Sequence, residues 1–194
     1  MLFNLPTSAL PPGITYLPDF ISSAEETELA RYLDAGDWSS ELKRRVQHFG
    51  YRYDYKARRV TPESHLGPLP GWIAPLALKL ANDGHFADTP DQVIANEYLP
   101  EQGISKHVDC EPCFGPVIAS LSLLSPCEMV FRTLDGSAKA GIVLEPRSLV
   151  ILSGEGRYAW THEIPARQSD LIDGLRQPRS RRISLTFRTT IVGV

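Results

Sequence analysis

The second half of this sequence consists of short apolar stretches separated by Pro, Gly and Ser, and this pattern constrains the fold more than any other feature. Many short strands at close spacing are typical of an antiparallel sandwich or jelly roll. We therefore predict an α+β chain that is mainly β. The expected strands cover residues 93–98, 106–109, 117–123, 128–133, 148–152, 157–160 and 183–192.

The first 90 residues show helical signals instead. Ser23-Ala-Glu-Glu26 has the spacing of a capping box and predicts a helix over residues 23–33. Residues 71–82 predict a second helix that ends at Asp83-Gly84. We expect both helices to pack on the outside of one sheet. A length of 194 residues, 42% of them hydrophobic, indicates a single globular domain over 1–194.

Composition also limits where such a chain can work. The longest apolar stretch, 72–81, is interrupted by Pro75 and Lys79, so we expect no membrane span. The N-terminus lacks the basic start of a signal peptide. Three cysteines, an odd number, favour a reducing compartment over a disulfide scaffold. We predict a soluble, cytoplasmic protein and expect a monomer.

Positive charge is concentrated in one place, residues 43–59, which we call the basic segment. It holds seven basic residues and one acid, whereas the whole chain has a net charge of −3. Within it, residues 48–55 interleave aromatic rings with arginine, so rings can stack on a base while guanidinium groups hold phosphates. Two alternatives stay open: a solvated basic face, or a core strand whose aromatic residues alternate inward.

Three residues could form a metal site. His107 and Asp109 are two positions apart, so they project from the same face of a strand. His162 lies far along the chain. Two imidazoles and one carboxylate form the facial triad of non-haem Fe(II) oxygenases. Taken alone, the first pair is better explained by a surface His beside an exposed Asp.

The last predicted strand strengthens this interpretation. One face carries Arg182, Ser184, Thr186 and Arg188, and the other carries only apolar residues. On an exposed strand two arginines would be unremarkable. In an enzyme barrel the polar face lines the interior, where a guanidinium fork can hold a carboxylate through two hydrogen bonds.

The series Asn96-Glu-Tyr98, His107-x-Asp109, His162 and Arg182-x5-Arg188 resembles the AlkB family of 2-oxoglutarate and Fe(II)-dependent dioxygenases, across roughly residues 91–190. The resemblance implies a double-stranded β-helix catalytic core over 91–194, preceded by helices and a nucleotide-recognition flap over 1–90. It implies that the iron ligands are the catalytic residues His107, Asp109 and His162. Asn96 and Tyr98 would hydrogen-bond 2-oxoglutarate, Arg182 would pair with its distal carboxylate, and Arg188 would lie near Asp109. O2 would be the second cosubstrate.

The resemblance also implies a nucleic-acid substrate. The expected reaction is oxidative demethylation of alkylated DNA or RNA bases such as 1-methyladenine and 3-methylcytosine, with release of formaldehyde. A tRNA wobble-uridine hydroxylase and a non-catalytic jelly-roll binding module are the alternatives. The expected substrate-binding residues are Tyr51, Arg52, Tyr53, Lys56 and Glu111.

Glu111 lies two residues beyond Asp109, so on an extended chain it points to the same face. Base-repair members of the resembled family often carry an acid at this position, where it reads the exocyclic amino group of the base. The alternative is an exposed side chain that turns away where Pro112 bends the chain.

The motif Cys110-Glu-Pro-Cys113 has a competing interpretation. With His107 and Cys127 it offers four ligands at zinc-like spacing. We expect instead that the cysteines are free thiols near the mouth of the pocket.

Overall fold

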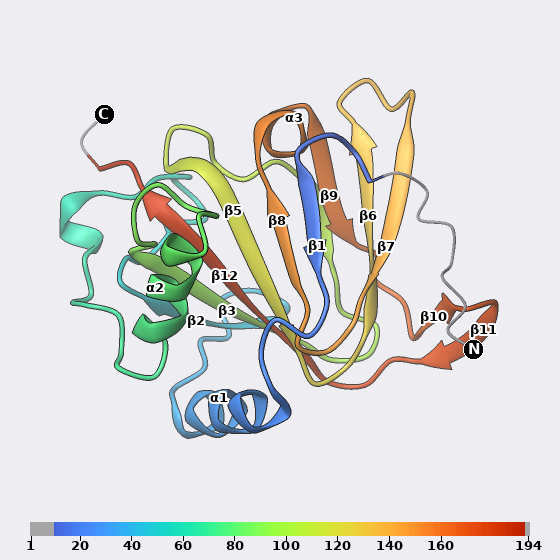
Figure 1. Ribbon diagram of the computed structural model, residues 1–194, viewed down its shortest axis with the longest axis horizontal. Coiled ribbons are helices and arrows are strands. Elements are labelled where there is room, and N and C mark those ends of the chain that lie inside the picture. Colours follow the sequence, from blue (N-terminus) through green and yellow to red (C-terminus); the bar gives the residue numbers. More distant parts are fainter. Residues whose placement is uncertain (1–9, 193–194) are drawn as a thin grey trace.

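The computed structural model describes residues 10–192 and shows two antiparallel sheets with helices beside one of them (Figure 1). The six-stranded sheet has the order β1 (Ile14–Leu17), β8 (Leu149–Leu152), β5 (Phe114–Leu123), β12 (Arg182–Thr190), β3 (Gln92–Tyr98) and β2 (Arg45–Phe49). The four-stranded sheet has the order β4 (Ile104–His107), β9 (Trp160–Ile164), β6 (Cys127–Thr133) and β7 (Lys139–Leu144). A separate hairpin is formed by β10 (Ser169–Ile172) and β11 (Leu175–Pro178). The predicted mainly-β jelly roll is confirmed.

Helices α1 (Ser23–Ala35) and α2 (Ala74–Asn82) correspond to the two predicted helices. The capping box of α1 lies one residue earlier than predicted, because Ser22 is the N-cap. Its Oγ accepts a hydrogen bond from Glu25 N at 3.2 Å, and its own backbone N–H donates to Glu25 Oε2 at 2.7 Å. A 3-10 turn, η1 (Pro62–Ser64), and a short helix, α3 (Gly154–Tyr158), complete the helical elements of residues 10–192.

The alternation along β12 shows which face of the six-stranded sheet packs against the helices and which faces the other sheet. Ile183, Leu185 and Phe187 belong to a buried apolar cluster with Leu33 of α1 and Leu80 of α2. The helices therefore cover this outer face, as predicted (Figure 1). The polar face of β12 is turned to the space between the two sheets. A second apolar cluster, with residues from both sheets, fills the rest of that space.

Two strand predictions need correction near the expected site. β4 ends at His107, so Asp109 lies in the loop that follows and not on the strand. The predicted strand over 157–160 is wrong, because Arg157 lies in α3 and β9 begins only at Trp160. A full helical turn fits between β8 and β9 here, and the sequence pattern did not separate it from a strand.

The basic segment is a strand for only part of its length. β2 ends at Phe49, and Gly50 follows with φ +76°, where an added Cβ would lie 1.8 Å from the Asp91 carbonyl oxygen. Only glycine fits this close approach. Beyond it the chain is held by isolated bridges, Tyr51 with His65 and Asp54 with Arg59. The alternative of one continuous inward-facing aromatic strand is therefore wrong.

No helix within residues 10–192 is long and apolar enough to cross a membrane.

Candidate active site

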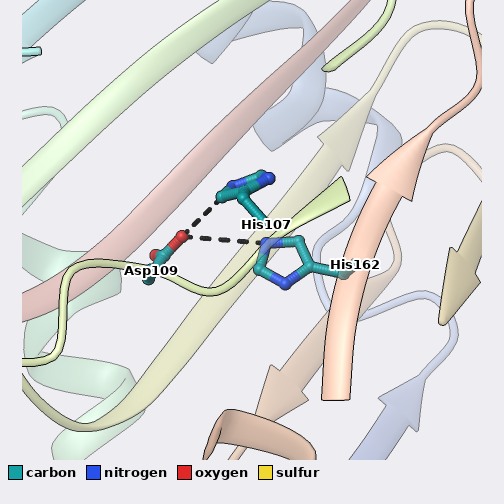
Figure 2. Close-up of side chains that lie close together, drawn as sticks. All are labelled: His107, Asp109 and His162. Atoms are coloured by element: carbon teal, nitrogen blue, oxygen red, sulfur yellow. Dashed lines mark ion pairs between the residues drawn. The ribbon is translucent and has the colours of Figure 1, made fainter. Parts of the chain in front are cut away.

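The two histidines and Asp109 converge on one point (Figure 2). His107 ends β4 and lies directly opposite His162 of β9 in the strand register. Asp109 reaches them from the loop after β4. Its Oδ1 lies 3.4 Å from His107 Nε2 and 3.7 Å from His162 Nε2. All three donor atoms lie within 4.8 Å of one another, a spacing that a single metal ion can bridge.

The protonation states of the cluster suit a divalent metal. Burial lowers the pKa of His162 to about 3, so its imidazole is neutral near pH 7. Burial alone would raise the pKa of Asp109, but Arg188 and the two imidazoles outweigh burial and hold this pKa well below its usual range. His107 Nδ1 lies 2.8 Å from the Ser105 carbonyl oxygen, so a proton on Nδ1 leaves Nε2 free for a metal. Two imidazole nitrogens and one anionic oxygen fit Fe(II).

Two buried arginines hold Asp109 in place. Arg188 Nε donates to Asp109 Oδ2 at 2.7 Å and leaves Oδ1 facing the imidazoles. Arg157 Nη1 donates to the Asp109 backbone carbonyl at 2.9 Å. The expectation that Arg188 lies near Asp109 is thus met by the geometry. The contact of Arg157 was missed, because its segment was predicted to be a strand.

A cavity of about 630 Å³ opens beside this cluster between the two sheets. Asn96 and Tyr98 of β3 line it next to Arg182 of β12, because Arg182 pairs with Tyr98 in the strand register. Arg182 Nη2 donates to Ser122 Oγ at 2.9 Å. Its Nε is buried and has no hydrogen-bond partner among the described residues. A buried N–H without a partner is costly, and a ligand carboxylate would satisfy it. These residues therefore fit 2-oxoglutarate.

The structure separates the expected substrate residues. Tyr53 lines the cavity, whereas Tyr51 packs on His65 with ring centroids 4.8 Å apart. Arg52 is exposed and paired with Glu41, and Lys56 lies in an exposed turn.

Glu111 is exposed in the turn after Asp109 and is not among the residues that line the cavity. Other basic and aromatic side chains line it instead. They are Lys43, Arg44, Tyr55, Arg58 and Lys106. The sequence showed that most of them belong to the basic segment but gave no sign of which ones reach inward.

The expectation of free thiols is wrong for two of the three cysteines. Cys110 and Cys113 form a disulfide in the turn after Asp109, with their Cα atoms 5.3 Å apart. This separation is in the ordinary range for a disulfide, because the turn brings the two residues together. Cys127 is free and buried in β6. The pairing also removes the structural zinc alternative, because bonded sulfurs are not thiolate ligands.

Comparison with known proteins agrees with this geometry. A family model described as 2OG-Fe(II) oxygenase superfamily matches residues 13–188. An Arabidopsis thaliana protein named "Alkylated DNA repair protein ALKBH8 homolog" is 38% identical over 91% of the chain and 58% of its own length. The Macaca fascicularis "tRNA (carboxymethyluridine(34)-5-O)-methyltransferase ALKBH8" is 37% identical over 91% of the chain and 28% of its own length. The chain thus spans less than two thirds of these two relatives.

Solved structures share the fold at low sequence identity. "The structure of OsALKBH1" matches with a TM-score of 0.70 and 18% identity, covering 95% of this chain and all of that one. A Pseudomonas putida prolyl-4-hydroxylase matches with a TM-score of 0.57 and 17% identity, covering 91% and 92% of the two chains. The family match, the relatives and the His-Asp-His cluster agree. The chain belongs to the 2OG-Fe(II) oxygenase superfamily as an AlkB-like dioxygenase that uses Fe(II), 2-oxoglutarate and O2.

Proposed function

We propose that this enzyme oxidises a substituent on a tRNA base, with a modified uridine as the first candidate. In this proposal His107, Asp109 and His162 hold Fe(II). Asn96, Tyr98 and Arg182 bind 2-oxoglutarate, and Arg188 fixes the carboxylate of Asp109. When bound, the iron with 2-oxoglutarate and O2 supplies the oxidising power to hydroxylate a C–H bond. The chain's residues orient the groups and exclude water from the reaction.

The charge of the side chains that line the cavity is the main argument for a uridine over a cationic methylated base. Asp109 is the single acidic residue among the described residues lining it, and Arg188 already neutralises this carboxylate. Six cationic residues line the same cavity. Arg182 is assigned to 2-oxoglutarate and Arg188 to Asp109, and the other four are Lys43, Arg44, Arg58 and Lys106. Such a lining favours a neutral or anionic base over a cationic one, because like charges in a partly enclosed site repel.

The name of one relative supports a tRNA uridine as the substrate. The Macaca fascicularis protein is named for an activity on carboxymethyluridine at position 34 of tRNA. A carboxymethyl group is anionic and would be attracted by the cationic lining. That name describes a methyltransferase more than three times as long as this chain, so only the substrate class bears on the proposal.

Oxidative demethylation of an alkylated base is the second candidate. The ring of Tyr53 lines the cavity in T-shaped contact with Tyr55, with centroids 5.0 Å apart, and can stack on an extruded base. The Arabidopsis relative is named for alkylated DNA repair. However, 1-methyladenine and 3-methylcytosine are cationic. The position of Glu111 offers them no carboxylate inside the cavity. The third alternative, a non-catalytic binding module, is wrong because the chain belongs to an enzyme family.

One assay separates the two candidates. The enzyme is incubated with Fe(II), 2-oxoglutarate and O2, either with tRNA bearing 5-substituted uridines or with oligonucleotides bearing 1-methyladenine or 3-methylcytosine. Mass spectrometry of the nucleosides should show the gain of one oxygen atom on the uridine. Loss of the methyl group with formaldehyde release, and no change of the uridine, would replace the proposal with the second candidate. The variant Glu111→Gln should behave as wild type in both arms.

A further inference from the structure

The basic segment reaches the cosubstrate side of the cavity through Arg44. We propose that Arg44 is a positioning residue that sets the affinity for 2-oxoglutarate by fixing the orientation of the Asn96 amide. The inference rests on the proposed binding of 2-oxoglutarate by Asn96, and does not depend on which nucleic acid is the substrate.

The contact is direct and partly buried. Arg44 Nε donates a hydrogen bond to Asn96 Oδ1 at 2.8 Å, across 52 positions of sequence. Asn96 is only 7% exposed. The Arg44 guanidinium carbon also lies 6.0 Å from the centroid of the Tyr98 ring. Arg44, Asn96 and Tyr98 all line the cavity beside Arg182. One side chain of the basic segment thus contacts both β3 residues that we assign to the cosubstrate.

This hydrogen bond selects one of the two orientations of the amide. An asparagine side chain has an oxygen that accepts and an NH2 group that only donates, and arginine only donates. Arg44 therefore holds Oδ1, and Nδ2 of Asn96 is left to face away from it. Among the hydrogen bonds of residues 10–192, the Asn96 side chain takes part in this one alone, as the acceptor. An N–H donor that faces the cavity suits a carboxylate, whereas a flipped amide would present an oxygen and repel it.

The backbone on both sides of Arg44 is fixed, so its guanidinium is held ready before any ligand binds. The next residue, Arg45, pairs with Glu97 through Nε–Oε2 at 2.5 Å and Nη2–Oε1 at 2.8 Å. Glu97 is 1% exposed and burial of this carboxylate makes the pair hard to break. On the other side, Gln102 Nε2 donates to the Lys43 carbonyl at 2.9 Å. Arg44 needs little reordering to hold the amide, which lowers the cost of binding a ligand there.

Calorimetric titration of 2-oxoglutarate into the Mn(II)-loaded protein, without nucleic acid, tests the proposal by binding and not by turnover. Arg44→Met keeps the aliphatic stem and removes the donor. We expect Kd for 2-oxoglutarate to rise about tenfold, as for the loss of a hydrogen bond that supports a charged contact. Mn(II) affinity and Tm should stay unchanged. Arg52→Met is the matched control, because it removes the same charge from the same segment at a residue outside the cavity. It should leave Kd unchanged.

A double-mutant cycle asks whether Arg44 acts through Asn96. In an Asn96→Ala background, Arg44→Met should change Kd less than about twofold, because no amide remains to be oriented. An equal loss in both backgrounds would mean that Arg44 acts by its charge alone, and would overturn the proposal. So would an unchanged Kd in both Arg44→Met and Arg44→Gln. If Asn96→Ala itself binds 2-oxoglutarate normally, the assignment of Asn96 fails, and the inference with it, whatever substrate the assay above identifies.

Discussion

Side-chain direction alternates regularly in the sheets but not throughout the basic segment. Along β12 the alternation of a strand holds over its whole length, so Arg182 and Arg188 both face the interior. In the basic segment the strand stops at Phe49. Beyond it, Tyr51 packs on His65 and Tyr53 lines the cavity, although an unbroken strand would point both to one face. Alternation therefore predicts side-chain direction only as far as a hydrogen-bonded ladder continues.

The same contrast applies to how firmly the two regions are held. β12 is hydrogen-bonded on both sides, to β3 and β5, and seven of its residues are buried. The part of the basic segment after Gly50 has isolated bridges and mostly exposed or half-buried residues. Local opening costs less free energy where few buried contacts and few ladder hydrogen bonds exist. The sheets thus suit the fixed geometry of a metal site, and the segment suits a surface that adapts to a large substrate.

The largest expected effect is on metal affinity, and it tests whether side chains alternate between the two faces of β9. His162 faces the metal cluster, whereas the next residue, Glu163, lies on the other face of β9 and pairs with Arg132. His162→Ala should lower the affinity for Co(II) or Mn(II) by more than about 100-fold, since even residues that only support a ligand cost tens of fold. Glu163→Gln should leave the affinity within about twofold. Metal titration calorimetry measures both, and similar losses in the two variants would contradict the assigned faces.

A smaller effect on binding is expected in the basic segment. Both arginines are exposed, but Arg58 lines the cavity, whereas Arg52 lies outside it and pairs with Glu41. Arg58→Met should weaken tRNA binding about fivefold and reduce the slope of log affinity against log salt by about one, as for one lost phosphate contact. Arg52→Met should change affinity about twofold or less. Fluorescence anisotropy at several salt concentrations measures both variants. Equal effects would show that total charge matters and that facing the cavity does not.

A third effect, on folding stability and not on binding, is expected where the two regions meet, at His48 of β2. Burial lowers the pKa of His48 to about 4, and the charge of Arg52 adds to this effect. The ordinary value, which the unfolded chain keeps, is near 6.5. As the pH falls from 6.5 towards 4, the unfolded state binds a proton that the folded state refuses, so the free energy of unfolding decreases.

His48→Gln should remove roughly 1–2 kcal/mol of the stability difference between pH 7 and pH 5. Urea unfolding of wild type and variant at the two pH values provides the measurement. An identical pH dependence in both proteins would mean that other groups cause the acid sensitivity.

The sequence alone determined much of the sheet half. The alternation of residues 182–188 and the two helices follow from local periodicity and spacing. The grouping of His107 with Asp109 follows from the family resemblance, because Asp109 lies beyond the end of β4. Most predicted strands coincide with observed ones, for example residues 128–133 with Cys127–Thr133. Local patterns sufficed because a buried strand or an amphipathic helix must repeat its burial at a fixed period.

Only the tertiary structure decided which residues outside the sheets reach the site. Arg44 meets Asn96 because β2 pairs with β3, and no local pattern reports a contact across 52 positions. Arg157 supports Asp109 from a helix that the sequence pattern did not reveal. Tyr53 lines the cavity and Tyr51 packs on His65, in a part of the chain that is held only by isolated bridges. Turns and irregular segments have no repeating direction, so their side chains are placed by the long-range packing around them.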